Sequence, residues 1–278
     1  MRGRPGSQLL HVVIAVLVVA ALAIAALHAL GSGKKLETCK ERVKLRVLLC
    51  AAAYEVWERA IAVYEAKSCV DVEPIYGSSG QLLAQLSVSQ NVDVYAPASW
   101  EYMEAALKRG LVEPGSVEPL ASYELAILVK AGNRLNITGI EDLTRPGIKV
   151  AICEPEGAAC GRYAVALLKD LGLYDEVSRN IVAYAENYAK LVALLKSGAV
   201  DAIIGWNVGH YWDPNSTLLI PIEEESPHKA AAIYIGVAAS SHKKEEAAKF
   251  IEFLKSPEIV NIWRSYGYRV EAAGRETP

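Results

Sequence analysis

The segment Ile75-Tyr76-Gly77-Ser78-Ser79-Gly80 is the part of the sequence that decides the fold, because it joins an apolar strand to the start of a helix. A second segment, Ala158-Ala159-Cys160-Gly161, has the equivalent place later in the chain. The first turn of a helix offers backbone N–H groups without partners and the positive end of the helix dipole. Two such helix starts that face each other predict a site for an oxyanion that needs no formal positive charge.

Strands and helices alternate around the first segment. Leu45 to Leu49 is a continuous apolar run, as is typical of a buried parallel strand. The helix after it is predicted from apolar residues at helical spacing: Val56, Trp57, Ala60, Ile61 and Tyr64. The next predicted elements are a strand from Val70 to Ile75, a helix around Leu82, Leu83 and Leu86, a strand from Val92 to Ala96 and a helix from Trp100 to Arg109 that ends at Gly110.

The same alternation continues in the second half of the chain. The predicted strands there are Glu124 to Val129, Lys149 to Ile152, Ala202 to Gly205 and Ala232 to Ala238. The predicted helices are a short one over 138–143, one through Tyr163 and Leu168 that ends at Gly172, one from Glu186 to Lys196, one from Lys243 to Lys255 and one from Pro257 to Tyr266. This order predicts an α/β protein with mainly parallel sheets. Such sheets bind ligands beyond the carboxyl ends of their strands, where both glycine-punctuated segments fall.

An apolar stretch from Leu9 to Leu30 precedes the α/β part. It approaches the roughly 20 residues that span a membrane, so we expect an N-terminal membrane helix over residues 9–30, after a short basic N-terminus over residues 1–8. Cleavage as a signal peptide is the alternative. Basic residues in the linker over 31–43 favour a cytoplasmic body by the positive-inside rule. We nevertheless expect the opposite orientation, with the body outside the cell.

Composition excludes some classes of protein. The chain has 278 residues, 52% of them apolar, and a net charge of −3. This length and apolar content support a substantial core in one large or two modest domains. A protein that binds nucleic acid usually has a basic face, and the net charge gives no sign of one. We therefore expect no nucleic acid partner.

Five cysteines are few for a disulfide scaffold. Cys39 precedes the first strand and Cys69 follows the first helix, so both fall at the same end of the sheet and we predict a Cys39–Cys69 disulfide. The alternative is five free thiols. Cys153 and Cys160 bracket one loop and lack the second Cys or His pair of a zinc site, so no metal is expected. Sequons at Asn136 and Asn215 are candidate glycosylation sites on an external face.

From about Leu45 to Val270 the chain resembles the solute-binding proteins of molybdate and tungstate ABC importers. The matches are Gly77-Ser78-Ser79-Gly80 with Leu82, Asp93-Val94-Tyr95-Ala96, Ile148 to Leu171, Glu186-Asn187, Gly198 to Asp201, and an ending shared by many extracellular solute binders. The resemblance implies the two-lobed type II periplasmic-binding-protein fold, without enzymatic activity or a cofactor. It also implies a monomer on the extracellular or periplasmic face of the membrane that delivers its oxyanion to an ABC permease.

In that family, two helix-start serines, backbone N–H groups of two loops and a tyrosine hydroxyl hold the oxyanion. The resemblance places the second serine at Ser79 and the backbone donors at Cys160 and Tyr188. The first serine falls on Ala52 and the tyrosine on Trp206, so two side-chain donors are altered. An acidic pair that expands the metal to six-coordinate in some members is absent. The implied ligand-binding set is Ala52, Ser78, Ser79, Cys160, Tyr188 and Trp206.

Other readings of these residues remain open to different degrees. Ser78 and Ser79 lack a nearby base for nucleophilic catalysis, and His210 is better explained as a loop histidine. A ferric-ion binder would need adjacent tyrosines, and a transcriptional effector would need a helix-turn-helix before Leu45. A binder of sulfate, phosphate or an organic carboxylate remains the alternative. Glu154 or Glu156 could accept a proton from phosphate.

The two lobes are expected to share the chain unequally. Lobe 1 is predicted over residues 44–122 and 236–278, and lobe 2 over residues 123–235. The strands near Glu124 to Val129 and Ala232 to Ala238 would then cross between the lobes. We expect these crossing strands to act as the hinge of a closure around the ligand.

Overall fold

The computed structural model describes residue 39 and residues 41–270, of which residues 42–270 form one compact unit. The predicted membrane helix over residues 9–30 lies outside the described residues. Among the residues that are described, no helix is long and apolar enough to cross a membrane.

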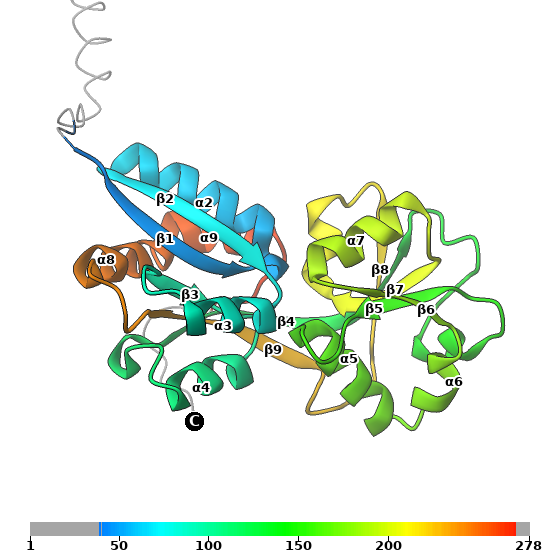
Figure 1. Cartoon of the computed structure of the whole chain (residues 1–278). Helices are drawn as coiled ribbons and strands as arrows, with labels where there is room; N and C mark the ends of the chain where they lie inside the picture. The colour runs from blue at the N-terminus through cyan, green and yellow to red at the C-terminus, as the bar shows by residue number, and fades with distance from the viewer. Residues whose placement is uncertain (1–38, 40, 271–278) are drawn as a thin grey trace, which may run out of the picture. The chain divides into compact units, whose positions relative to one another are not determined.

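Lobe 1 is built around the buried strand β1 (Val43–Cys50). Strands β2 (Val70–Gly77) and β3 (Val94–Ala96) flank it, and both run parallel to it. In Figure 1, α2 (Tyr54–Lys67) lies above these strands, and α3 (Ser79–Val88) and α4 (Trp100–Lys108) lie below them. The helices of this lobe are α2 (Tyr54–Lys67), α3 (Ser79–Val88), α4 (Trp100–Lys108), α8 (Lys244–Leu254) and α9 (Pro257–Ser265), and two 3-10 turns are η1 (Ala51–Ala53) and η2 (Pro114–Ser116).

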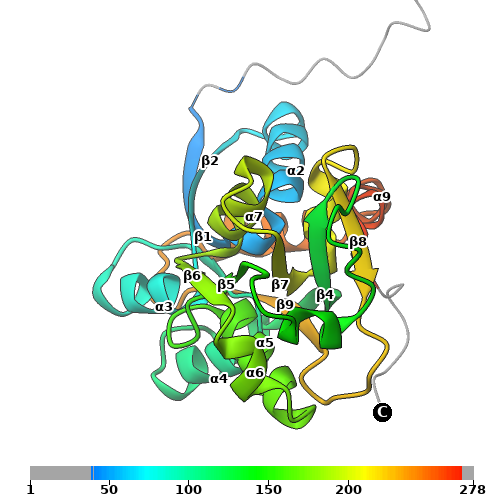
Figure 2. The same cartoon turned by 90° about the vertical axis from the view of Figure 1, so that its right-hand side faces the viewer.

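Lobe 2 repeats this plan around β5 (Val150–Cys153). Strands β6 (Ile181–Ala185) and β7 (Ala202–Trp206) flank β5 and run parallel to it. The helices α5 (Ala159–Asp170) and α6 (Tyr174–Ser178) lie on one side of these strands, and α7 (Tyr188–Ser197) lies on the other (Figures 1 and 2). The remaining elements are the edge strand β8 (Thr217–Pro221) and the 3-10 turns η3 (Ile140–Thr144) and η4 (Asn207–Trp212).

Two long strands connect the lobes. β4 (Glu118–Lys130) pairs with β9 (Ala230–Val237), and together they carry the sheet order β2-β1-β3-β9-β4-β7-β5-β6 through both lobes. The predicted boundaries at residues 122–123 and 235–236 fall inside these two strands, although the boundaries themselves stay a prediction.

The prediction of mainly parallel sheets needs correction, because the sheet is mixed. The pairs of β1 with β2 and β3, and of β5 with β6 and β7, are parallel, whereas β9 with β3, and β4 with β7, β8 and β9, are antiparallel. The reason is topological: one strand carries the chain from lobe 1 to lobe 2 and the other returns it, so the two must run in opposite directions. The helical predictions fared better, and all five apolar residues predicted for α2 are buried.

Candidate anion-binding site

A small cavity of about 10 Å³ lies between the lobes, at the carboxyl ends of β1, β2, β5 and β7. This volume is far below the roughly 300–1,000 Å³ of pockets for drug-sized ligands, so the cavity suits a small ion. The structure brings all six residues of the predicted ligand-binding set to this one cavity. Its lining consists of Cys50, Ala51, Ala52, Gly77, Ser78, Ser79 and Ala98 from lobe 1, and of Ala158, Ala159, Cys160, Tyr188 and Trp206 from lobe 2.

Four helix starts meet at the cavity. Ala52 lies in η1, the 3-10 turn that leads into α2, and Ser79 is the first residue of α3. From the other side, Cys160 lies in the first turn of α5 and Tyr188 is the first residue of α7. The N–H groups of a first helical turn have no partner within the helix, and the helix dipole makes this end positive. The wall is therefore rich in backbone donors for an anion.

Ser78 and Ser79 have different roles in this wall. Ser78 caps α3: its N–H and its hydroxyl both lie within hydrogen-bond distance of the Gln81 Oε1 atom, at 3.0 and 3.1 Å, and its Oγ accepts from the Gln81 N–H. The Ser79 Oγ instead accepts the Ala98 N–H at 3.0 Å. A hydroxyl that accepts a hydrogen bond still has its own proton to donate. Ser79 thus keeps both its hydroxyl and its N–H for a ligand, whereas Gln81 occupies the donors of Ser78.

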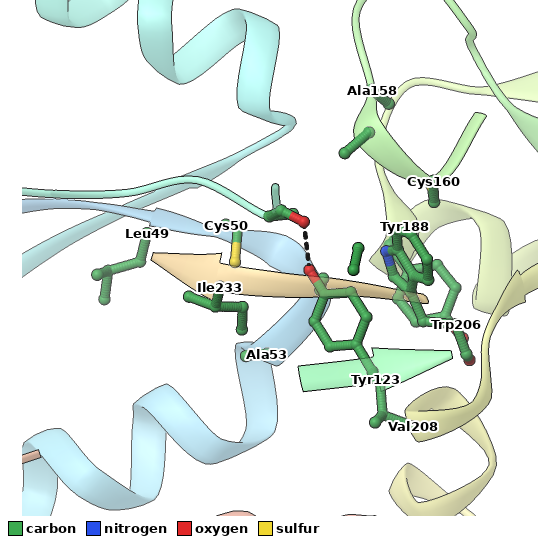
Figure 3. Close-up of a cluster of buried hydrophobic side chains, with 14 of the residues drawn as sticks. Leu49, Cys50, Ala53, Tyr123, Ala158, Cys160, Tyr188, Trp206, Val208 and Ile233 are labelled. Carbon is green, nitrogen blue, oxygen red and sulfur yellow. Dashed lines mark hydrogen bonds between the residues drawn. The ribbon is translucent and has the colours of Figure 1, made fainter. Parts of the chain in front are cut away.

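Trp206 supplies an unpartnered side-chain donor to the cavity. The residue is fully buried, and its indole N–H has no hydrogen-bond partner. A buried donor without a partner is costly, so an acceptor atom of a ligand in the cavity would stabilise this N–H group. In Figure 3, Trp206, Tyr188, Cys160 and Ala158 face Cys50 and Ala53 of the other lobe. The Tyr188 hydroxyl donates to the Trp206 carbonyl. The backbone N–H of Tyr188 lies at the start of α7, where it has no acceptor within the helix.

Three buried aromatic side chains that were not predicted as part of the site hold the cavity wall in place. The Tyr268 hydroxyl donates to the Ala52 carbonyl at 2.5 Å, and the Trp57 indole donates to the Cys50 carbonyl at 3.0 Å. The Tyr123 hydroxyl donates to the Ala98 carbonyl at 2.5 Å, as the dashed line in Figure 3 marks. These bonds satisfy carbonyl oxygens of the wall.

The cavity wall carries no charged side chain. Cys50 is the free cysteine of the described residues, and burial raises the pKa of its thiol to about 12, so it is neutral near pH 7. Glu154 and Glu156 do not line the cavity. The Glu154 Oε2 atom accepts the Gly157 N–H at 2.6 Å instead. The surroundings therefore consist of neutral donors, without a carboxylate that could accept a ligand proton.

Contacts between the lobes border the cavity. The Gly80 N–H donates to the Gly157 carbonyl at 2.9 Å. Nearby, the Arg162 guanidinium donates to the Tyr102 hydroxyl at 3.0 Å, and the Tyr163 hydroxyl donates to Glu101 at 2.9 Å. The lobes are thus joined by hydrogen bonds on the same side as the cavity wall.

One of the two expectations for the cysteines, that all five are free thiols, is contradicted by the structure. Cys153 and Cys160 form a disulfide, with their Cα atoms 5.8 Å apart, so the alternative of five free thiols is wrong. The spacing of seven residues gave no sign of it, because only the fold of the β5–α5 loop brings the two close. The Cys39–Cys69 pairing stays a prediction.

The other candidate groups lie away from the cavity. His210 belongs to η4, and its Nδ1 atom lies 3.1 Å from the Thr217 hydroxyl. Across residues 39 and 41–270, no group of three or more His, Cys, Asp or Glu residues is placed to hold a metal ion.

The chain belongs to the family of bacterial extracellular solute-binding proteins, whose pattern matches residues 45–269. It is 26% identical over 221 residues to the molybdate-binding protein ModA of Rhodobacter capsulatus. The alignment covers 76% of this chain and 82% of the relative. Among solved structures, the periplasmic molybdate-binding protein of Azotobacter vinelandii aligns with a TM-score of 0.72 at 22% identity, over 82% of this chain and 99% of that protein. The sulfate-binding protein SubI of Mycobacterium tuberculosis aligns with a TM-score of 0.68 at 17% identity, over 82% and 87% of the two chains.

Proposed function

We propose that this protein captures a tetrahedral oxyanion, molybdate or tungstate, between its two lobes and delivers it to an ABC importer. The observation that carries the proposal is the cavity formed by four helix starts and the unpartnered Trp206 indole N–H. Neutral donors of this kind stabilise an anion because each N–H points its positive end at the ligand. The named molybdate-binding relatives support the choice of ligand.

The proposed donors are the N–H groups of Ala52, Ser79, Cys160 and Tyr188, the Ser79 hydroxyl and the Trp206 indole. A hydrogen bond to a charged group contributes about 1.5–3 kcal/mol, and desolvation and lobe closure oppose binding. A dissociation constant of roughly nanomolar to micromolar follows. Ala52 offers no hydroxyl, so one donor fewer is available than in the family pattern.

Sulfate is the second candidate, since the fold also resembles that of a named sulfate-binding protein. Phosphate is disfavoured by the wall. Near neutral pH phosphate carries a proton that needs an acceptor, and the cavity lining contains no carboxylate. Glu154, the acceptor considered from the sequence, is occupied by Gly157.

The family supports the setting that we propose for this function. We propose that the lobes lie outside the cell, where they can deliver the anion to an ABC permease, with residues 9–30 as an anchor in the membrane. We propose that a single copy works as the capturing unit, because both halves of the cavity come from one chain.

Isothermal titration calorimetry with molybdate, tungstate, sulfate and phosphate tests this proposal. We expect saturable binding of one molybdate or tungstate per chain, with sulfate weaker and phosphate weakest. Tight phosphate binding without a response to molybdate or tungstate at millimolar concentration would contradict it.

A further inference from the structure

The loop between β5 and α5 is closed into a small ring by the Cys153–Cys160 disulfide. Cys153 is the last residue of β5 and Cys160 is the second residue of α5. The ring thus spans the whole connection between strand and helix.

This ring carries two functions at once. Ala158, Ala159 and Cys160 form part of the cavity wall. The Gly157 carbonyl accepts the Gly80 N–H of lobe 1 at 2.9 Å, and the Glu156 carbonyl accepts the Tyr102 hydroxyl at 3.3 Å. The same few residues therefore present donors to the cavity and acceptors to the opposite lobe.

The helix starts at the cavity are fastened in different ways. Ser78 and Gln81 form a capping box on α3, and the Asn187 side chain caps α7 by accepting the Lys190 N–H at 3.0 Å. The start of α5 has Ala158 at its N-cap position and no side-chain cap. The disulfide instead ties the first turn of α5 covalently to the end of β5.

The packing around the ring leaves little freedom for the loop to relax in another way. A side chain at Gly161 would place its Cβ 2.2 Å from the Cys153 carbonyl oxygen, so helix and strand touch through backbone at this point. The Glu154 side chain and carbonyl accept the N–H groups of Gly157 and Ala158, at 2.6 and 3.0 Å. These bonds lie inside the ring that the disulfide closes.

We infer that Cys153 and Cys160 are positioning residues, whose disulfide sets the 154–159 loop for both anion binding and lobe closure. The part that concerns the anion rests on the proposed function. A loop that is ordered before the ligand arrives does not lose its conformational entropy on binding. Cys160 acts on the ligand through its N–H, which any residue has, and Cys153 acts through Cys160. The sulfur atoms therefore matter for the shape of the loop and not for contact with the ligand.

The test compares wild type with Cys153→Ala/Cys160→Ala by two measurements. Hydrogen exchange of the loop amides, without any anion, reports the order of residues 154–161. Calorimetric titration with molybdate reports the affinity. Both are made well below the melting temperature of each protein, so that global unfolding does not contribute. The matched control is Cys39→Ala/Cys69→Ala. It removes two cysteines near the amino ends of β1 and β2, at the end of these strands away from the cavity.

We expect the loop amides to exchange at least tenfold faster in Cys153→Ala/Cys160→Ala, while the core of lobe 1 is unchanged. Molybdate affinity should fall about tenfold in this variant and remain at the wild-type value in the control. A merely structural disulfide would lower the melting temperature and leave the affinity unchanged.

Loop exchange within twofold of wild type would overturn the inference, and faster exchange with unchanged affinity would overturn its link to the anion site. If wild type binds no anion, the proposed function fails, and the exchange measurement still tests the loop separately. If the double variant does not fold, exchange is measured on folded Cys39→Ala/Cys69→Ala treated with a phosphine reductant. Cys153–Cys160 is then the disulfide under test.

Discussion

The Gly80 N–H and the Gly157 carbonyl form a backbone hydrogen bond of 2.9 Å between the two lobes, and this contact leaves no room for a side chain. A Cβ on Gly80 would lie 2.6 Å from the Gly157 oxygen, closer than real Cβ atoms approach. Gly80, the last residue of the first glycine-punctuated segment, therefore contributes to lobe closure, while its neighbour Ser79 contributes to the cavity wall.

Gly80→Ala should hinder closure and weaken molybdate binding at least tenfold, because the added methyl group pushes the Gly157 loop away. Gly115→Ala is the matched control: a Cβ there meets no atom within 4 Å. Calorimetry measures the affinities, and small-angle scattering with saturating molybdate measures the degree of closure. Equal affinity and equal compaction in Gly80→Ala and Gly115→Ala would contradict this role.

Ser79→Ala and Ser78→Ala should separate ligand binding from helix capping. Loss of the Ser79 hydroxyl removes a donor to the anion, so we expect affinity to fall roughly tenfold to a hundredfold. Ser78→Ala removes the cap of α3 and should lower the free energy of unfolding by about 0.5–2 kcal/mol, with a smaller effect on affinity. Denaturant titration and calorimetry on both variants measure the two effects. The reverse pattern would show that the roles are exchanged.

Trp206→Phe should weaken anion binding roughly tenfold, because phenylalanine keeps an aromatic ring and loses the indole N–H. Trp212→Phe is the control, since the Trp212 indole N–H is also buried and unpartnered but does not line the cavity. Calorimetric titration of the two variants under identical conditions makes the comparison. If both lose affinity equally, the Trp206 N–H is not a ligand donor.

The number of free thiols tests both disulfides together. Denatured, unreduced protein should show one reactive thiol per chain, from Cys50. Three would show that one of the two disulfides is absent, and five that both are absent. In the folded protein Cys50 should resist alkylation near pH 8, because burial holds its pKa near 12 and keeps the reactive thiolate scarce.

The sequence predicted the parts of the fold that local rules govern. The α2 core face and the helix end at Gly198, which has a φ of 78°, follow from apolar spacing and from glycine in the left-handed region. Strand β6 was missed because it lies at a sheet edge and exposes Val182 and Tyr184, so its pattern is not that of a buried strand. The edge strand β8 and the short helix α6 were missed as well.

The general location of the candidate site was predictable, because the carboxyl ends of parallel strands meet at one edge of a sheet. This rule, with the family resemblance, placed Ser79 and Cys160 correctly at one cavity. It could not predict the Cys153–Cys160 bond or the contact of Tyr268 with Ala52, 216 residues apart in sequence. Such contacts depend on packing between distant segments, for which one sequence carries no local pattern.

The most direct test of the central claim is a crystal structure of the protein grown with tungstate, measured at a wavelength where tungsten scatters anomalously. We predict one strong anomalous peak in the cavity, within hydrogen-bond distance of the Ser79 hydroxyl and of the N–H groups of Cys160 and Tyr188. An empty cavity at saturating tungstate, or a peak only elsewhere on the molecule, would contradict the account.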